Sequence, residues 1–254
     1  MGKGVKVQRN KEKSPSTFNL QPSTPFKVQE LKIFDSKKAL VDISFSIEDS
    51  FALVGQSGSG KSLTLKRLLG MLPSNLNSRF KYNWEYKLQK GKSVVLVPQN
   101  PFTSLSPMTK IKDNFFVNDE EMITLLKMVG LEEWIKERFP SELSGGQLQR
   151  VIIAIALSHK PKMLLLDEPT TALDSELKEQ ILRLIKTLQK EVGFKIFFVT
   201  HDIGSTVLLC EKIAIINKGK IVESGKIDDI LSNPKEDYTK RLIEANFKNR
   251  EFRC

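Results

Sequence analysis

One eight-residue pattern constrains this chain more than any other feature of its sequence. The pattern G-x-x-x-x-G-K-[ST] fills residues 55–62, after the apolar residues 51–54 and before leucines at helical spacing. A strand that turns through such a loop into a helix aims backbone amides and the positive end of the helix at phosphate groups. A random chain of this length contains the pattern about once in a hundred cases, and the flanks make chance rarer still. The sequence therefore predicts a P-loop that binds a nucleoside triphosphate.

The loop residues are expected to divide the phosphate chemistry between them. Lys61 would bridge the terminal phosphates as a point charge, and Ser62 would bind Mg²⁺. The other candidates for nucleotide binding are the remaining loop residues: Gly55, Gln56, Ser57, Gly58, Ser59 and Gly60. A P-loop alone does not say what the energy of the nucleotide drives.

A second acidic element follows downstream, where the apolar residues 163–166 lead into Asp167 and Glu168. Carboxylates at the end of a buried strand are costly unless a cation or hydrogen bonds compensate them. Taken alone, the pair is more typical of a solvated turn. Downstream of a P-loop it predicts that Asp167 holds Mg²⁺ and that Glu168 acts as general base toward water.

The order of apolar segments indicates an α/β fold with a mostly parallel sheet. Residues 40–47 alternate apolar and polar side chains, as a half-buried strand does, whereas residues 51–54, 94–97, 163–166 and 196–199 are apolar with little alternation. Unbroken apolar strands between helical segments predict a parallel sheet covered on both faces. A helix is expected to begin at Asp174 and end at Gly193, and residues 217–219 predict a hairpin turn.

Domain boundaries follow from changes in composition. Residues 1–25 carry basic residues followed by Ser, Pro and Thr, which predicts a flexible basic tail before a domain over residues 26–254. Between residues 101 and 149 the strand pattern gives way to helical pattern, so a helical subdomain of about residues 100–158 is expected inside the core. The sequence shows no internal repeat.

Composition excludes some classes of protein. Apolar runs are too short to cross a bilayer, no secretory signal follows the first lysines, and Cys210 and Cys254 form no disulfide or zinc pattern. We therefore expect a protein of the reducing cytosol. A net charge of +10 fits nucleic acid, an anionic membrane surface or a solvated lysine-rich surface, and charge alone does not decide between them.

A glycine-bearing turn at residues 143–147, Leu-Ser-Gly-Gly-Gln, lies shortly before the Asp167 strand. In isolation it indicates no more than a helix start with Ser144 as N-cap. In this position it resembles the signature of the ATP-binding cassette (ABC) ATPases. The resemblance covers essentially residues 27–254 and implies a P-loop cassette with a RecA-like core, an antiparallel β subdomain and a helical subdomain.

The resemblance assigns roles to further residues. Gln99 resembles the Q-loop glutamine that touches Mg²⁺, Asp174 closes a segment that resembles the D-loop, and His201 resembles the switch histidine that contacts the γ-phosphate. Phe34 is the best match to the aromatic residue that stacks on adenine, although tyrosine is usual there. The family also implies that two cassettes pair head to tail, so that the ATP of one is closed over by the other through Ser144, Gly145, Gly146, Gln147 and Asp174.

Two local stretches resemble the ATPases of the dipeptide, oligopeptide and nickel importers. They are residues 98–107 and residues 233–242. This resemblance implies a second, homologous ATPase subunit, two permease subunits and an extracytoplasmic substrate-binding protein, with the cassette on the cytoplasmic face of the inner membrane. A pair of identical ATPase subunits is the alternative to two different ones. Residues 60–64 and 69–73 are most similar to the nickel-type first ATPase of these systems. The expected lack of the long cysteine-bearing extension of some peptide-type members favours nickel or a metal chelate over di- or oligopeptides.

Two other classes remain as alternatives. A soluble ABC ATPase acting on nucleic acid would fit the basic charge, but those chains carry long coiled coils and this sequence has no sustained heptads. An exporter cassette is the second alternative. The importer-like stretches argue against it, so we expect ATP and Mg²⁺ as cofactors, a transport role and no nucleic-acid partner.

Overall fold

A computed structural model describes residues 24–36, 38–171 and 173–251 of this chain, with the side chains of residues 247–251 left out. The basic tail predicted for residues 1–25 falls outside the described residues, apart from Thr24 and Pro25. Ala172 also falls outside them.

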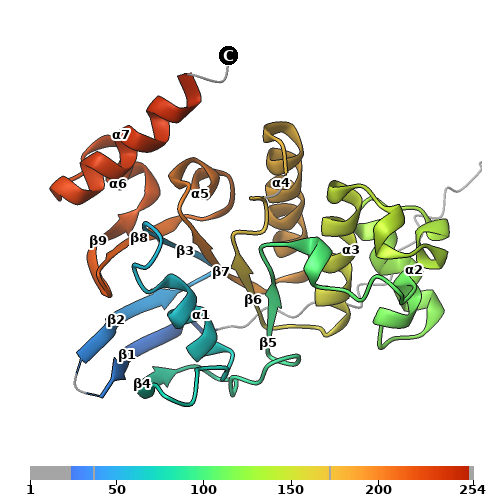
Figure 1. The fold of residues 1–254 in the computed structure, drawn as a ribbon, viewed down its shortest axis with the longest axis horizontal. Helices are drawn as coiled ribbons and strands as arrows, with labels where there is room; N and C mark the ends of the chain where they lie inside the picture. Colours follow the sequence, from blue (N-terminus) through green and yellow to red (C-terminus); the bar gives the residue numbers. More distant parts are fainter. Residues whose placement is uncertain (1–23, 37, 172, 252–254) are drawn as a thin grey trace, which may run out of the picture.

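The centre of the fold is a six-stranded sheet (Figure 1). Its strands run in the order β5 (Val94–Val97), β6 (Met163–Asp167), β7 (Lys195–Thr200), β3 (Ser50–Val54), β8 (Lys212–Asn217) and β9 (Lys220–Lys226). The first five are parallel to their neighbours, and β9 pairs antiparallel with β8. The predicted strands and the hairpin at residues 217–219 are all present.

Each central strand is buried on both faces, which explains why its sequence does not alternate. In β3, Ala52 and Val54 join one hydrophobic cluster, whereas Phe51 and Leu53 join another on the opposite face. The first cluster includes residues of α3 (Gly145–Ser158), α4 (Ser175–Val192) and α5 (Ile203–Leu209). The second includes α1 (Lys61–Leu68) and the smaller sheet. Apolar side chains are therefore needed at successive positions.

The smaller sheet is antiparallel, in the order β2 (Lys38–Ile47), β1 (Phe26–Asp35) and β4 (Asn77–Asn83). Its aromatic side chains pack on the main sheet, where Phe45 stacks on Phe51 and Phe197 at ring-centroid distances of 5.2 and 5.3 Å. This contact fixes the small sheet against the strand that leads into the P-loop.

The segment between β5 and β6 is helical (Figure 1). It contains 3₁₀ turns, α2 (Asp119–Met128) and α3, and residues 98–162 hold no strand. Asn118 caps α2 through the amide of Glu121, and the Arg150 side chain donates to the carbonyl of Val129, which ties α3 to the end of α2. The predicted fold class is confirmed: an α/β P-loop cassette with an antiparallel sheet and a helical region.

After β9 the chain forms α6 (Ile227–Ser232) and α7 (Asp237–Glu251), and α7 packs on α5. None of the helices in the described residues combines the length and the apolar character that a membrane crossing requires.

Candidate functional site

The carboxyl ends of β3, β6 and β7 meet around one cavity of about 660 Å³. Twelve residues line it: Leu40, Gln56, Ser57, Gly58, Gly60, Lys61, Ser62, Leu63, Gln99, Asp167, Glu168 and His201. Ten of these were predicted as site residues from the sequence. Ligands of open α/β sheets bind at this edge, so the topology and the motifs indicate the same place.

The P-loop forms the floor of the cavity. Gly58 and Gly60 adopt φ angles of +76° and +112°, which favour glycine, and a Cβ on Gly60 would lie 2.8 Å from Cγ2 of Val41. α1 begins at Lys61, directly after the loop, and its amino-terminal end is the positive end of its dipole. This geometry suits a phosphate chain.

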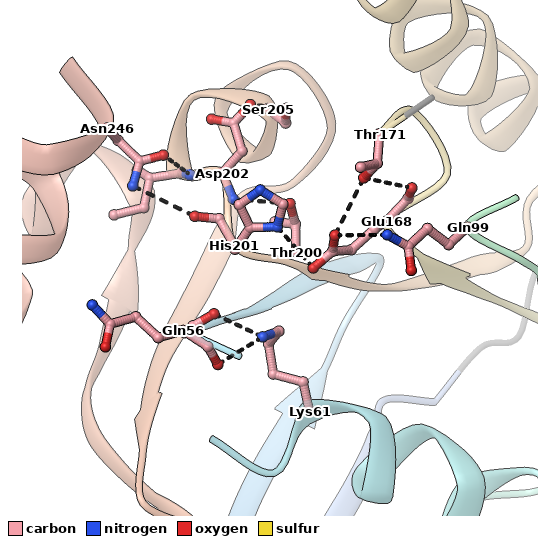
Figure 2. Close-up of polar contacts among 12 residues, drawn as sticks. Gln56, Lys61, Gln99, Glu168, Thr171, Thr200, His201, Asp202, Ser205 and Asn246 are labelled. Carbon is pink, nitrogen blue, oxygen red and sulfur yellow. Dashed lines mark hydrogen bonds and ion pairs between the residues drawn. The ribbon is translucent and has the colours of Figure 1, made fainter. Parts of the chain in front are cut away.

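Lys61 is 6% exposed, and its ammonium donates to the carbonyls of Gly55 and Gln56 at 2.7 and 3.0 Å (Figure 2). Burial lowers the pKa of Lys61, while Glu168 and Asp167 act in the opposite direction. A buried cation beside two carboxylates is placed to exchange these carbonyl contacts for phosphate oxygens.

Asp167 ends β6 at the cavity wall. Burial raises its pKa, with Glu168 as the next contribution, and Lys61 and Lys66 oppose the shift. This carboxylate fits a magnesium ion, because a divalent cation would remove the cost of the two adjacent negative charges. The described residues hold no group of three His, Cys, Asp or Glu side chains that could hold a metal ion.

Glu168 has a left-handed backbone with φ of +46°, unusual for a residue with a side chain. Its amide still donates to the carbonyl of Val199 at 2.9 Å, so the strand pairing is kept. The side chain is 13% exposed and held on both oxygens (Figure 2). Oε1 lies 2.9 Å from Nδ1 of His201, and Oε2 accepts from Thr171 Oγ1 at 3.2 Å and from Gln99 Nε2 at 3.4 Å.

His201 follows β7 and keeps 57% of its side chain exposed. Its carbonyl accepts from the Nδ2 of Asn246 at 3.4 Å, and the next residue, Asp202, donates its amide to Thr200 Oγ1 at 3.0 Å (Figure 2). The imidazole is thus fixed on one side by Glu168 and open to the cavity on the other.

The signature residues do not line this cavity. Ser144 and Gln147 form a reciprocal capping box at the start of α3. Gly145 and Gly146 lie against Leu173 and Leu177, since added Cβ atoms would come within 3.4 and 3.3 Å of those leucines. In the same region, Asp174 caps α4 by accepting from the amide of Leu177 at 2.9 Å.

Phe34 also lies outside the lining. It is half-buried near the end of β1, where it pairs with Ala39 and Asn77. Leu40 of β2 lines the cavity. The adenine-stacking role of Phe34 stays a prediction.

Five residues of the site region were not identified from the sequence. Leu40 and Leu63 line the cavity, Thr171 contacts the carboxylate of Glu168, Asn246 contacts the His201 loop, and the hydroxyl of Tyr238 accepts from the amide of Gln56 at 3.3 Å. Leu63 directly follows the P-loop and Thr171 lies three residues after Glu168, so sequence proximity could have indicated these two. The other three are brought close by long-range packing.

Known proteins resemble this chain in sequence. The family model described as "ABC transporter" matches residues 40–171. The peptidoglycan transport ATP-binding protein YejF of Agrobacterium fabrum is 36% identical over 78% of this chain and 41% of its own. The oligopeptide transport ATP-binding protein OppD of Bacillus subtilis is 35% identical over 82% of this chain and 66% of its own. The glutathione import ATP-binding protein GsiA of Escherichia coli is 32% identical over 91% of this chain and 43% of its own. The chain thus spans less than two thirds of each of these relatives.

Solved structures give the same result. CbiO1 from Clostridium perfringens, described as part of the ABC transporter complex cbiONQ, superposes with a TM-score of 0.71 at 25% identity, over 89% of this chain and 97% of its own. The ATP-binding cassette MJ0796 is described as a dimer in a post-hydrolysis state bound to ADP and Pi. It has a TM-score of 0.65 at 27% identity, over 80% of this chain and 98% of its own. By its motifs, its fold and these likenesses, the chain belongs to the ABC transporter family as an ATP-binding cassette.

Proposed function

We propose that this chain binds Mg-ATP and hydrolyses it as one of a pair of cassettes that power a membrane permease. The observation that carries the proposal is the single cavity that brings together Lys61 of the P-loop, the Asp167–Glu168 pair and His201. Lys61 begins α1, which follows β3, and the other three residues lie at the ends of the neighbouring strands β6 and β7. Their charges are arranged for phosphate, a divalent cation and a water molecule.

The residues divide the reaction as follows. The Lys61 ammonium and the amides at the start of α1 hold the terminal phosphates. Asp167, Ser62 and Gln99 would hold Mg²⁺, which supplies charge neutralisation on the phosphate oxygens. Glu168 takes the proton of the attacking water, because its carboxylate is held in place by His201, Thr171 and Gln99. His201 then positions both Glu168 and the γ-phosphate.

The pairing of two cassettes is supported by residues that lie away from the cavity. Ser144, Gly145, Gly146, Gln147 and Asp174 belong to two helix starts outside the lining of their own P-loop site. A second cassette, facing this one head to tail, would bring those helix starts to the opposite nucleotide. The dimeric state of MJ0796 is consistent with this arrangement.

The cargo proposed for the transporter is of the peptide class. Relatives named for peptidoglycan, oligopeptide and glutathione transport support it, together with the importer-like residues 98–107 and 233–242. None of these three is named for nickel, so the nickel preference drawn from the sequence finds no support in them. The proposed partners are a second cassette (a homologous ATPase or another copy of this chain), two permease subunits and an extracytoplasmic binding protein, with the chain on the cytoplasmic face of the inner membrane.

The test is the solution mass of the Glu168→Gln chain with and without ATP. We expect ATP binding together with a doubling of mass, because the variant keeps the shape of the site but cannot complete the reaction. A monomer that binds ATP would require a different partner cassette. A chain that binds no ATP would overturn the proposal, and hydrolysis by the wild-type chain that depends on added DNA would favour a nucleic-acid role.

A further inference from the structure

Helix α7 reaches the candidate site from a distant part of the sequence. Asn246, near its end, makes three side-chain hydrogen bonds. Its Oδ1 accepts from the amide of Ile203 at 3.2 Å, and its Nδ2 donates to the carbonyls of His201 at 3.4 Å and Leu242 at 2.8 Å. Two of the three bonds therefore hold the backbone on either side of Asp202 (Figure 2).

The start of α5 needs such a contact because its N-cap side chain accepts no hydrogen bond from the first amides of the helix. Asp202 is the N-cap residue, yet its side chain accepts from no amide of the helix. The carboxylate is instead bound by Lys178 of α4 and by the hydroxyl of Ser205 at 2.7 Å. The first amides of a helix lack partners within the helix, so Asn246 provides for Ile203 what a capping side chain normally provides.

α7 is itself held in place at its beginning. The amides of Lys235 and Glu236 donate to the two carboxylate oxygens of Glu223 at 2.9 and 3.2 Å, and Leu242 is buried in the core. Tyr238 accepts from the amide of Gln56, whose carbonyl accepts from Lys61. The helix therefore touches the P-loop with its first turn and the His201 loop two turns later.

We propose that Asn246 is a positioning residue for ATP hydrolysis, acting through the backbone of residues 201–203 to hold His201 against Glu168. The inference rests on the hydrolytic function proposed above. The His201 side chain is largely exposed, so few packing contacts restrain it, and its direction is set by its backbone and by one contact with Glu168. A displacement of about 1 Å at a catalytic group can cost a hundredfold in rate.

The experiment compares the full chain with three variants. Asn246→Leu keeps the approximate volume and removes all three bonds. Tyr238→Phe removes the hydrogen bond between α7 and the P-loop but keeps the contacts of Asn246 with residues 201–203. Glu244→Ala, at an exposed position on the same helix, is the matched control. Each protein is measured for phosphate release, for affinity toward a fluorescent ATP analogue, and for its histidine imidazole resonances in proton NMR.

The NMR readout does not depend on turnover. The chain has two histidines, so the resonance of His201 is identified by its loss in His201→Gln, and His159 is an internal reference for folding. In Asn246→Leu we expect kcat to fall about tenfold, the size expected when hydrogen bonds that orient a reacting group are lost. Nucleotide affinity should change by less than about twofold, because no phosphate contact is removed.

Under the proposal, the His201 resonance shifts or broadens in Asn246→Leu but not in Tyr238→Phe or Glu244→Ala, and His159 is unchanged in all three. Wild-type kcat together with a wild-type His201 resonance would overturn the proposal. A change at both histidines would also overturn it, because that result indicates general unfolding rather than positioning. If the wild-type chain hydrolyses no ATP, the proposed function fails, but the His201 resonance still decides the role of Asn246.

Discussion

Nδ1 of His201 lies 2.9 Å from Oε1 of Glu168, and this contact joins the ends of two neighbouring parallel strands. β6 delivers Glu168 through a left-handed backbone, and β7 delivers His201 one residue past its last strand position. A carboxylate and an imidazole in this relation can orient one another, and either can orient a water molecule. The pair therefore sets the geometry in which the γ-phosphate and water would meet.

The Glu168→Gln variant should bind ATP with nearly wild-type affinity and lose at least about a hundredfold in turnover, because an amide keeps the shape but not the basicity of the carboxylate. Phosphate release and binding of a fluorescent ATP analogue measure the two properties separately. Glu191→Gln, at an exposed position of α4, is the control and should be fully active. Near wild-type hydrolysis in Glu168→Gln would remove Glu168 from the role of general base.

The Asp167→Asn variant should melt at a higher temperature than the wild-type chain when nucleotide is absent. Burial and Glu168 raise the pKa of Asp167 in the folded state, so ionising this group costs stability in the native protein. The unfolded carboxyl ionises at about pH 4, so the cost builds up as the pH rises from there to the raised folded pKa and is constant above it. The advantage of Asp167→Asn should therefore vanish below about pH 4 and be largest at neutral pH.

Melting curves across this pH range provide the measurement, and Asp113→Asn, at an exposed position, should show no such trend. Asp167→Asn should also lose the extra stabilisation that Mg²⁺ adds when nucleotide is bound, since the cation has lost a carboxylate partner. A lower melting temperature at neutral pH would show that Asp167 is compensated within the apo chain.

The sequence predicted those parts of the fold whose signals are local. The unbroken apolar run of β6, the P-loop and the helix from Asp174 to Gly193 each carry their information within a few residues. β4 was not predicted, because its side chains alternate between exposed and half-buried and it is completed only by pairing with β1. A strand of this kind has no strong hydrophobic period of its own.

The candidate site shows the same division. Lys61, Asp167, Glu168 and His201 belong to motifs and were predicted together, and the structure places all four around one cavity. Their chemical roles remain predictions. Asn246 lies 45 residues from its partner His201, and no local pattern marks it. Leu40 lines the cavity only because β2 packs beside the P-loop. Contacts of this kind depend on topology, which motifs do not encode.

Two variants inactivated in different parts of the site should complement each other when mixed. Lys61→Ala removes the phosphate contact, and Ser144→Arg places bulk and charge on the helix start proposed to close over the partner's ATP. Each alone should be inactive. In a mixture, the P-loop of the Ser144→Arg chain faces the intact signature of the Lys61→Ala chain, so one site per mixed pair is complete. About a quarter of wild-type activity is expected for equal mixing and independent sites.

Steady-state hydrolysis across mixing ratios tests this prediction, and the activity should be greatest at equal amounts. The Ser144→Arg chain also loses an N-cap, which costs about 1 kcal/mol, so its melting curve must show that it remains folded. Absence of any recovery, with both chains folded, would contradict a head-to-tail pair of identical subunits and favour a different partner cassette.

Gly219 in the β8–β9 turn should be intolerant of any side chain. Its φ is +78°, and an added Cβ would lie 2.0 Å from the carbonyl oxygen of Leu40. Its amide donates to the carbonyl of Ser59 at 2.9 Å and its carbonyl accepts from the amide of Asp42 at 2.7 Å. One residue thus ties the hairpin, the P-loop and β2 together, and Gly219→Ala should lower the free energy of unfolding by about 2–4 kcal/mol.

Gly91→Ala is the matched control, because Gly91 has a similar φ of +71° but no atom within 4 Å of an added Cβ. Gly91→Ala should lower the free energy of unfolding, measured for both variants in urea, only by the cost of a left-handed backbone at alanine, about 1–2 kcal/mol. Gly219→Ala should in addition weaken ATP binding, since a shift of Leu40 and Ser59 alters the wall and the floor of the cavity. Equal losses in the two variants would mean that the backbone of Leu40 yields easily, and that the hairpin does not constrain the P-loop.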